Sequence, residues 1–198
     1  MTSTSTPGKR VLVILPTLNE AKNLQILVPK LLAHDGFRLL IIDDRSTDGT
    51  GTTAEELAQL FPGRIEVVHR TGTRGLGLSY AEVFPKAASA DVDVICQMDA
   101  DLSHDPQHLP QMVDATERYD VVVGSRYLDE SRLVDWPGYR AALSLGANMY
   151  VRLLTGLKGR DCTSGYRCWR RAVIQRMRWD RINTAGFAFL VETLCEAA

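Results

Sequence analysis

Asp99 and Asp101 are the side chains best placed for chemistry in this sequence. They directly follow the apolar run Val92–Met98, which is typical of a buried strand. Carboxylates two residues apart at the end of a strand point the same way and repel each other, and a divalent cation relieves that repulsion. Asp-x-Asp also occurs by chance, and its alternative role is to cap the next helix. Asp105 is already placed as that cap, so Asp99 and Asp101 remain candidates for a metal.

A second group of candidate residues is suited to phosphate. Arg126 follows another apolar run, Asp120–Gly124, and Arg140 and Ser144 stand four residues apart on the predicted helix Tyr139–Thr155. A guanidinium fork and a hydroxyl on one helix face together suit a phosphate group. Spacing alone favours a plain surface position for Arg140 beside neighbouring aromatic residues.

One stretch resembles a calcium-binding loop. Asp44, Ser46, Asp48 and Gly49, with Glu55 further on, nearly fit the EF-hand pattern. An EF-hand loop is entered from a helix, whereas an apolar strand-like run precedes this one. We therefore expect Ser46, Asp48 and Gly49 to shape a strand-to-helix turn, and the Asp44 carboxylate to accept hydrogen bonds from a nucleobase.

The sequence lacks the glycine-rich loops that are typical of a dinucleotide-binding or P-loop site. No G-x-G-x-x-G or G-x-x-x-x-G-K-[ST] pattern follows the first apolar run. The stretch Gly72–Gly77 is rich in glycine but comes later and fits neither pattern. It predicts either a flexible loop over the site or an ordinary surface turn.

The elements that must position these residues alternate regularly. Apolar runs typical of strands lie at Val11–Leu15, Leu39–Asp43, Ile65–His69, Val92–Met98 and Asp120–Gly124. Helical patterns lie at Ala21–Leu32, Thr53–Leu60, Leu78–Ala88 and Pro106–Glu117, and then, without further strands, at Tyr139–Thr155, Ala172–Met177 and Gly186–Ala197. The alternation predicts an α/β fold with a doubly wound, mostly parallel sheet flanked by helices, in which ligands bind beyond the carboxyl ends of the strands.

Finer features of the helices follow from single residues. Pro29 and Pro85 lie inside two helical patterns and should kink or split those helices. Thr53 and Glu56 match a capping box, which places the start of the second helix at Thr53.

Composition sets the class of protein. The chain has 198 residues, 45% of them hydrophobic and 24% charged, as in an ordinary globular protein of one domain. Residues 1–8 are polar and predict a disordered leader rather than a signal peptide, and no apolar stretch is long enough to span a bilayer. The four cysteines form no C-x-x-C pair, so we expect no zinc site and no need for an oxidising compartment.

Charge is distributed unevenly along the chain. Residues 126–181 contain 12 basic and 5 acidic residues, a net charge of +7, which leaves 11 basic and 19 acidic residues, a net charge of −8, in the rest. A basic segment on an acidic body suggests an anionic partner. A solvated basic face is the alternative, and charge alone favours it.

Seven motifs in order resemble one family. They are Pro16–Glu20, Asp43–Thr50, Gly75–Gly77, Met98–Pro106, Gly124–Tyr127, Leu145–Asn148 and Asp161–Arg167. Together they resemble the polyprenol (dolichol) phosphate mannose synthases, which are inverting glycosyltransferases of family 2 with the GT-A fold. The resemblance covers the chain from about residue 10 onward.

The resemblance implies an activity and a set of site residues. The activity is transfer of mannose from GDP-mannose to a polyprenyl phosphate, giving polyprenyl phosphate mannose and GDP, with Mg²⁺ or Mn²⁺ as the cofactor. By position, the guanosine pocket is formed by Pro16, Leu18, Glu20, Ile42 and Asp44. The metal and diphosphate are held by Asp99, Ala100 and Asp101, with Ser103 near the metal. Arg126 contacts phosphate, and Arg140 and Ser144 receive the acceptor phosphate. The catalytic set is therefore Asp101, Arg126, Arg140 and Ser144.

The resemblance also shapes the expected organisation. We expect one catalytic domain over residues 9–198, with a nucleotide-binding part at 9–125 and an acceptor part at 126–198, ending before the family's closing loop. Leu18, Arg45 and Leu145 depart from residues common in the family. The expected place is the cytosolic face of a membrane, with a membrane subunit or tail left open as a partner and no nucleic acid. The alternatives are another donor such as UDP-glucose, or a truncated, inactive nucleotide-binding protein.

Overall fold

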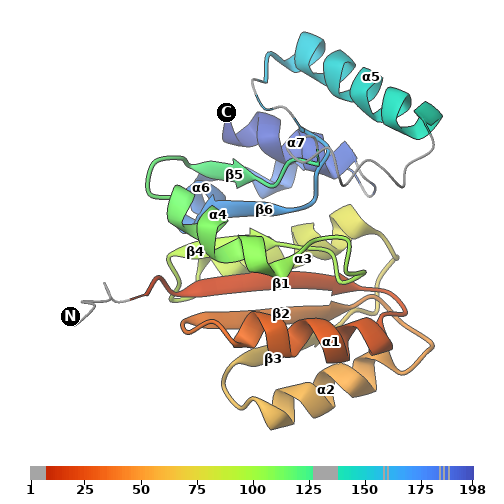
Figure 1. The fold of residues 1–198 in the computed structure, drawn as a ribbon, viewed down its shortest axis with the longest axis vertical. Coiled ribbons are helices and arrows are strands. Elements are labelled where there is room, and N and C mark those ends of the chain that lie inside the picture. The colour runs from red at the N-terminus through yellow and green to blue at the C-terminus, as the bar shows by residue number, and fades with distance from the viewer. Residues whose placement is uncertain are drawn as a thin grey trace.

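The computed structural model describes residues 8–126, 138–157, 159, 161–182, 184, 186 and 188–198, with backbone alone for 138–143. The predicted leader lies almost entirely outside these residues. One six-stranded sheet forms the centre of the molecule (Figure 1). Its strands are β1 (Val11–Thr17), β2 (Phe37–Asp43), β3 (Ile65–His69), β4 (Val94–Gln97), β5 (Val121–Val123) and β6 (Arg167–Arg170), in the spatial order β3-β2-β1-β4-β6-β5.

The sheet is mostly parallel, with one reversed strand. β1 is parallel to β2 and β4, and β2 is parallel to β3. β6 runs antiparallel to both of its neighbours, β4 and β5. The carboxyl ends of β1 to β5 and the start of β6 therefore share one edge. The expectation of helices alone after residue 125 is wrong, because β6 inserts between β4 and β5.

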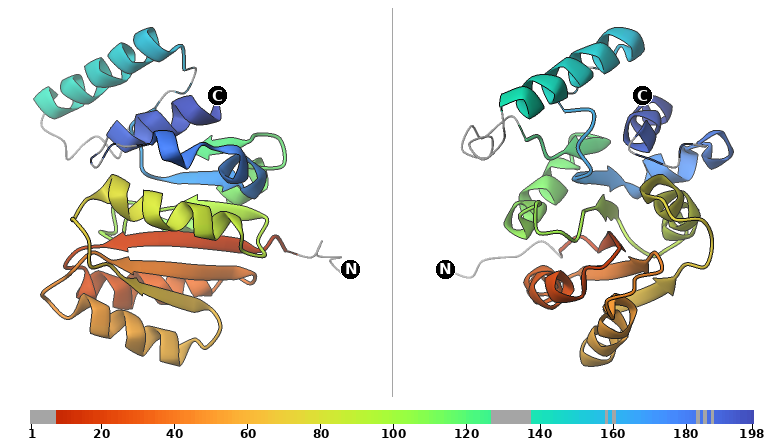
Figure 2. Two further views of the ribbon diagram at one scale, coloured as in Figure 1. Left: turned by 180° about the vertical axis from the view of Figure 1, so that it is seen from behind. Right: turned by 90° about the vertical axis from the view of Figure 1, so that its right-hand side faces the viewer.

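Helices cover both faces of the sheet (Figure 2). α1 (Ala21–Leu32), α2 (Thr50–Leu60), the short 3₁₀ turn Pro106–His108 and α4 (Leu109–Ala115) pack on one face. α3 (Leu76–Ala88), α6 (Arg171–Arg176), the 3₁₀ turn Trp179–Arg181 and α7 (Ala188–Ala197) pack on the other. In β1, Val11, Val13 and Leu15 belong to the first core, whereas Leu12 and Ile14 belong to the second. The predicted doubly wound α/β class is confirmed.

The remaining helix, α5 (Gly138–Thr155), lies at one end of the molecule, and α2 lies at the other (Figures 1 and 2). The start of α5 faces the same side as the loops that follow β1 and β2 (Figure 1). In the described part of the chain, no helix combines the length and the apolar character needed to cross a membrane.

Several predicted helix boundaries need correction. α1 and α3 each run through their proline, Pro29 and Pro85, so neither helix is split. α2 begins at Thr50 and not at Thr53, because Gly49 takes a left-handed conformation with φ 92° and the helix turns directly after it. The capping box at Thr53 is therefore wrong. The predicted cap at Asp105 is confirmed, since its side chain accepts from the Gln107 N–H at 2.9 Å.

Candidate active site at the carboxyl edge of the sheet

The loops after β1 and β2 are joined by side-chain hydrogen bonds. The Asn19 N–H donates to Ser46 Oγ, and the Thr47 N–H donates to Asn19 Oδ1, both at 2.9 Å. The backbone of Asn19 and Arg45 is left-handed, with φ 62° and 64°. Much of the polar sequence at this edge therefore serves to hold the two loops together.

Asp48 joins the starts of α1 and α2 at the same edge. Its carboxylate accepts from the Thr50 N–H at 3.0 Å, from Thr50 Oγ1 at 2.5 Å and from the Ala21 N–H at 3.2 Å. The hydrogen bond from Thr50 is the main reason that the pKa of Asp48 lies below its usual value. The prediction that Asp48 and Gly49 shape a turn is confirmed.

Asp44 is held by groups from the third β-α connection. Arg70 donates to one of its carboxylate oxygens at 2.5 Å, and the Gly75 N–H donates to the other at 2.9 Å. Arg70 also bonds Ser79 and Glu82 on α3. The stretch Gly72–Gly77 is thereby anchored to the strand edge, and a base at Asp44 would bind to a carboxylate whose position is already fixed.

The other residues assigned to a guanosine pocket occupy different environments. Ile42 is fully buried in the core beneath α3, so its side chain does not line the edge. Pro16 is its register partner on β1, and Leu18 is half-exposed just beyond. Glu20 begins α1 and accepts from Asn23 at 2.5 Å. Pro16, Leu18, Glu20 and Asp44 are thus gathered near the ends of β1 and β2, whereas Ile42 can contribute only backbone.

Asp99 follows β4, and its backbone and carboxylate both lie beside His104. The Asp99 N–H donates to His104 Nδ1 at 3.1 Å, and His104 Nε2 lies 3.8 Å from Asp99 Oδ2. Since Nδ1 accepts, a neutral His104 carries its proton on Nε2, toward the carboxylate. The ring of His104 stacks on Tyr166, with centroids 4.8 Å apart. His104 belongs to the motif Met98–Pro106, but no pattern in the sequence indicates this role for it.

The second carboxylate, Asp101, lies in a tight loop. Leu102 has φ 65°, and the Ser103 N–H turns back to donate to Asp101 Oδ1 at 3.0 Å. Ala100 between the two aspartates is buried in the core, which directs the carboxylates outward. The contact of Ser103 with Asp101 is therefore through its backbone, and a role for its hydroxyl at a metal stays a prediction.

The pKa of Asp99 reflects this setting. Burial raises it above the usual value, and the negative charge of Asp101 raises it further, while His104 and Arg126 act in the opposite direction. A divalent cation would remove the same electrostatic cost. The described residues contain no group of three or more His, Cys, Asp or Glu side chains suited to a metal. The pair Asp99 and Asp101 fits a cation whose other positions are taken by oxygens of the ligand.

Arg126 is bound to the loop that precedes β6. Its Nε and Nη2 donate to the two oxygens of Asp161, each at 2.8 Å, and its Nη2 also donates to Thr163 Oγ1 at 2.7 Å. Asp161 is buried, which acts to raise its pKa, but the hydrogen bonds and charge of Arg126 outweigh this and hold the pKa below its usual value. The guanidinium that sequence analysis placed at the edge is thus held in one orientation.

Helix α5 joins this group through Asn148. Its amide nitrogen donates to Thr163 Oγ1 at 3.3 Å and to the Ser144 carbonyl at 3.1 Å, and its Oδ1 accepts from the Cys162 N–H at 2.8 Å. Through Asn148, the backbone of Ser144 is connected to Thr163, the residue to which Arg126 also donates. The side chain of Arg140 lies outside the described residues.

Arg167, at the start of β6, ends the motif Asp161–Arg167, to which the sequence assigned no role of its own, and it is fully buried. Its guanidinium donates to the carbonyls of Cys162, Ser164 and Leu190 and to Thr193 Oγ1, at 2.6 to 3.2 Å. Burial lowers its pKa to about 10. Arg167 joins the loop that positions Arg126 to helix α7, so its role is structural support for the edge.

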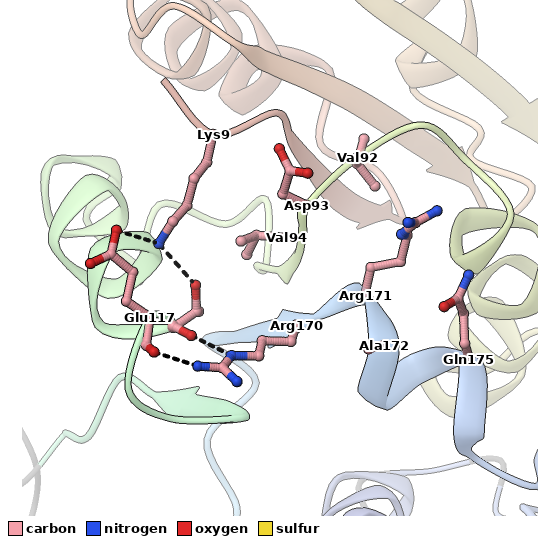
Figure 3. Close-up of a pocket in the computed structure, with 10 residues that line it drawn as sticks. Lys9, Val92, Asp93, Val94, Glu117, Arg170, Arg171, Ala172 and Gln175 are labelled. Atoms are coloured by element: carbon pink, nitrogen blue, oxygen red, sulfur yellow. Dashed lines mark hydrogen bonds and ion pairs between the residues drawn. The ribbon is translucent and has the colours of Figure 1, made fainter. Parts of the chain in front are cut away.

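A hollow of about 350 Å³ lies elsewhere, at the opposite edge of the sheet (Figure 3). Its charged groups are occupied by the chain itself: Lys9 contacts Glu117 and the Val113 carbonyl, and Arg170 bonds the Thr116 and Glu117 carbonyls. It contains none of the residues singled out by sequence. The carboxyl edge, and not this hollow, therefore carries the candidate chemistry.

Comparison with known proteins decides the family. The model of the family described as glycosyl transferase family 2 matches residues 12–178. The chain belongs to glycosyl transferase family 2. The polyprenol monophosphomannose synthase of Mycolicibacterium smegmatis is 38% identical over 192 residues, which cover 96% of this chain and 72% of that protein. The dolichol-phosphate mannosyltransferase of Pyrococcus furiosus is 35% identical over 191 residues, which cover 93% of this chain and 52% of that protein.

Several solved structures share the fold of this chain. A glucosyl-3-phosphoglycerate synthase from Mycobacterium tuberculosis, in complex with Mn²⁺ and UDP, has a TM-score of 0.65 at 18% identity, covering 94% of this chain and 64% of that one. A mannosyltransferase from Pyrobaculum calidifontis, in complex with GDP-Man and Mn²⁺, has a TM-score of 0.59 at 18% identity, covering 88% and 49%. The chain thus spans about half to two thirds of the length of these structures, and the likeness confirms the GT-A-type fold.

Proposed function

We propose that this family 2 glycosyltransferase transfers mannose from GDP-mannose to a polyprenyl phosphate with inversion, giving polyprenyl phosphate mannose and GDP. The observation that carries the proposal is the placement of Asp99, Asp101 and Arg126 on one edge of the sheet, close enough for their charges to interact. The curated relatives named as mannose synthases supply the sugar and the acceptor class.

The donor side of the site is the acidic part of the edge. Asp44, preset by Arg70 and Gly75, is placed to accept hydrogen bonds from the base. Asp99 and Asp101 would hold Mg²⁺ or Mn²⁺, which when bound stabilises negative charge on the departing diphosphate. His104 binds the backbone N–H of Asp99, and its Nε2 lies 3.8 Å from the Asp99 carboxylate.

The acceptor side is the basic part. A phosphate monoester is already anionic near neutral pH, so its attack on the anomeric carbon needs little help from a general base. Arg126 presents a cation fixed by Asp161, and Ser144 on α5 lies beside the same loop. Arg140, on the same helix, is assigned to the acceptor phosphate by resemblance alone. The protein's part is to hold the acceptor in line with the leaving group.

An activity assay tests the proposal. Release of GDP from GDP-mannose with a short polyprenyl phosphate should require a divalent metal, and Asp101→Ala should reduce the rate by about a hundredfold or more. Asp91→Ala is the matched control, because Asp91 is an exposed aspartate that pairs with Arg10 away from the site. Metal-independent turnover, or full activity of Asp101→Ala, contradicts the metal role. Tighter binding of UDP than GDP in calorimetry with Mn²⁺ contradicts the mannose donor.

The acceptor also implies a place of action. A polyprenyl phosphate resides in a membrane, so we propose that the enzyme works at the cytosolic face of a membrane. The net positive charge of residues 126–181 supports this, because it suits an anionic surface.

A further inference from the structure

Two side chains near the end of β4 carry buried hydrogen-bond donors that the protein does not satisfy. They are the hydroxyl of Tyr80, on α3, and the amide nitrogen Nε2 of Gln97, the last residue of β4. Both residues are fully buried, and neither atom has a hydrogen-bond partner within the described part of the chain. A buried donor without an acceptor is costly, because it has given up its hydrogen bonds to water and gained none in return. Two such donors therefore indicate an acceptor that the two side chains share.

The direction of the Gln97 amide is fixed by Trp169. The indole Nε1–H of Trp169, on β6, can only donate, and it donates to Gln97 Oε1 at 2.9 Å. The atom beside the indole is therefore the amide oxygen, and Nε2 points away from it. Trp169 is itself fully buried, so this bond is shielded from solvent.

Aromatic packing fixes the ring of Tyr80. It stacks on Phe84 of the same helix and on Phe189 of α7, with centroids 5.4 Å and 5.7 Å apart. Burial raises the pKa of Tyr80 well above its usual value, and the negative charge of Asp99 raises it further, while the Gln97 amide acts in the opposite direction. Because such effects fade with distance, the hydroxyl lies near both of these side chains.

The alternation of β4 turns Asp99 toward the same donors. Successive residues of an extended chain point to opposite faces of the sheet. Met98 and Ala100 belong to the core beneath α1 and α4, whereas Tyr80 belongs to the core beneath α3. Gln97 and Asp99 alternate with the first two residues and so lie on the α3 side. The hydroxyl, the amide and the carboxylate therefore share one side of the sheet.

We propose that Tyr80 and Gln97 are positioning residues for the Asp99 carboxylate, acting through one ordered water molecule that accepts from both donors and donates to the carboxylate. Neither donor reaches Asp99 directly, and a bridging water is the usual way to span such a gap between polar groups. A buried water with three hydrogen bonds is an ordinary part of a protein interior.

The inference deepens the proposed function and rests on it, because that function places the metal at Asp99 and Asp101. Side chains that contact metal ligands from behind set the orientation of those ligands, and their loss weakens metal binding. Tyr80 and Gln97 would hold the buried side of the Asp99 carboxylate, which leaves its outer side for the cation.

Manganese binding tests the proposal without turnover. Tyr80→Phe removes the hydroxyl and keeps the stacked ring. Titration calorimetry of the whole protein with Mn²⁺, at saturating GDP, should show about tenfold weaker binding for Tyr80→Phe than for wild type. The thermal midpoint without metal should match wild type, because the hydroxyl bonds no group of the protein. Tyr119→Phe is the matched control, since Tyr119 is exposed in the loop before β5, and it should bind Mn²⁺ as wild type.

A second variant and a crystal structure test the amide and the water. Gln97→Met keeps the length of the side chain, removes Nε2 and should also weaken Mn²⁺ binding about tenfold. It leaves Trp169 without its acceptor, so its thermal midpoint should fall, unlike that of Tyr80→Phe. A crystal structure with GDP and Mn²⁺ should place a water within hydrogen-bond distance of the Tyr80 hydroxyl, Gln97 Nε2 and one Asp99 oxygen.

The outcomes separate the positioning role from the proposed reaction. Equal Mn²⁺ affinity of Tyr80→Phe and wild type overturns the proposal, and so does a crystal structure in which the Gln97 amide bonds the Tyr80 hydroxyl with no water facing Asp99. A lowered thermal midpoint of Tyr80→Phe with unchanged Mn²⁺ affinity assigns the hydroxyl to packing and overturns it too. Weaker Mn²⁺ binding by Tyr80→Phe, in a wild type that transfers no mannose to a polyprenyl phosphate, contradicts the proposed function and supports the role of Tyr80.

Discussion

Arg126 binds the buried carboxylate of Asp161 through two parallel hydrogen bonds of 2.8 Å each. The backbone N–H of Arg126 donates to the same carboxylate at 3.1 Å. The two residues are 35 positions apart, so the contact joins the end of β5 to the loop before β6. Since a bidentate pair fixes the plane of the guanidinium as well as its distance, Asp161 sets the orientation of the Arg126 side chain.

Removing the charge of Asp161 should therefore lower the stability of the protein. We expect Asp161→Asn to lower the free energy of unfolding by about 1–3 kcal/mol, because an amide cannot accept both arms of the fork. Chemical denaturation measures the loss. Asp120→Asn is the control, since Asp120 is exposed and pairs with Arg170 at 3.3 Å on the surface, where ion pairs contribute little. Equal losses in the two variants would show that the Arg126 pair has no special weight.

The same pair predicts how stability depends on pH. Burial acts to raise the pKa of Asp161, but Arg126 prevails and the folded-state pKa lies below the usual value. A depressed pKa stabilises the fold above the unfolded-state pKa of about 3.9 and loses that contribution as the pH falls through the folded-state value. The stability difference between wild type and Asp161→Asn should thus be constant above about pH 4 and shrink below it. Urea denaturation over an acid pH series measures this, and a difference that grows on acidification contradicts it.

Arg167 offers a third prediction. Its fork reaches three carbonyls and one hydroxyl inside the protein, a geometry that a lysine ammonium cannot reproduce. We expect Arg167→Lys to destabilise the protein by about 2 kcal/mol or more. A domain of this size should then lose about 4–8 °C in thermal midpoint. Arg178→Lys is the control, because Arg178 is half-exposed and meets Glu196 at 3.6 Å. A shift in thermal midpoint no larger than that of the control would exclude a stabilising role for the buried hydrogen bonds of Arg167.

The parallel part of the sheet could be predicted from the sequence, and β6 could not. The first four strands are continuous apolar runs separated by helical patterns, so each can be recognised from its local sequence. β6 is Arg-Cys-Trp-Arg, with charged residues at both ends and only two apolar residues between them. It is a strand because β4 and β5 supply partners on both sides, a long-range condition that no local pattern records.

The site divides in the same way. Asp99, Asp101 and Arg126 were predictable because each follows an apolar strand, and such strands end at a common edge. The partners that orient them were not, since Asp161 lies 35 residues from Arg126 and Arg70 lies 26 residues from Asp44. Ile42 illustrates the limit of a resemblance, because its assignment to the guanosine pocket by position did not reveal that its side chain faces the core.

Gly165 allows a direct test of whether the position of the Asp99 carboxylate matters for activity. A Cβ at this position would lie 3.3 Å from Asp99 Oδ2 and 3.4 Å from Asp99 Oδ1, closer than a methyl group ordinarily approaches. Gly165→Ala should push the Asp99 carboxyl group aside by a few tenths of an ångström. We expect kcat to fall by about tenfold, since a misplacement of about 1 Å costs about a hundredfold, and the Mn²⁺ concentration for half-maximal activity to rise.

The control for Gly165→Ala is Gly146→Ala on α5, where a Cβ meets no atom within 4 Å. Replacing that helical glycine should stabilise the protein slightly and leave the Mn²⁺ dependence unchanged. Denaturation curves for both variants separate a loss of fold from a loss of the site. If Gly165→Ala unfolds more easily while its kcat and Mn²⁺ dependence match wild type, the close approach to Asp99 serves packing alone. A raised Mn²⁺ requirement with intact stability instead places the metal at Asp99.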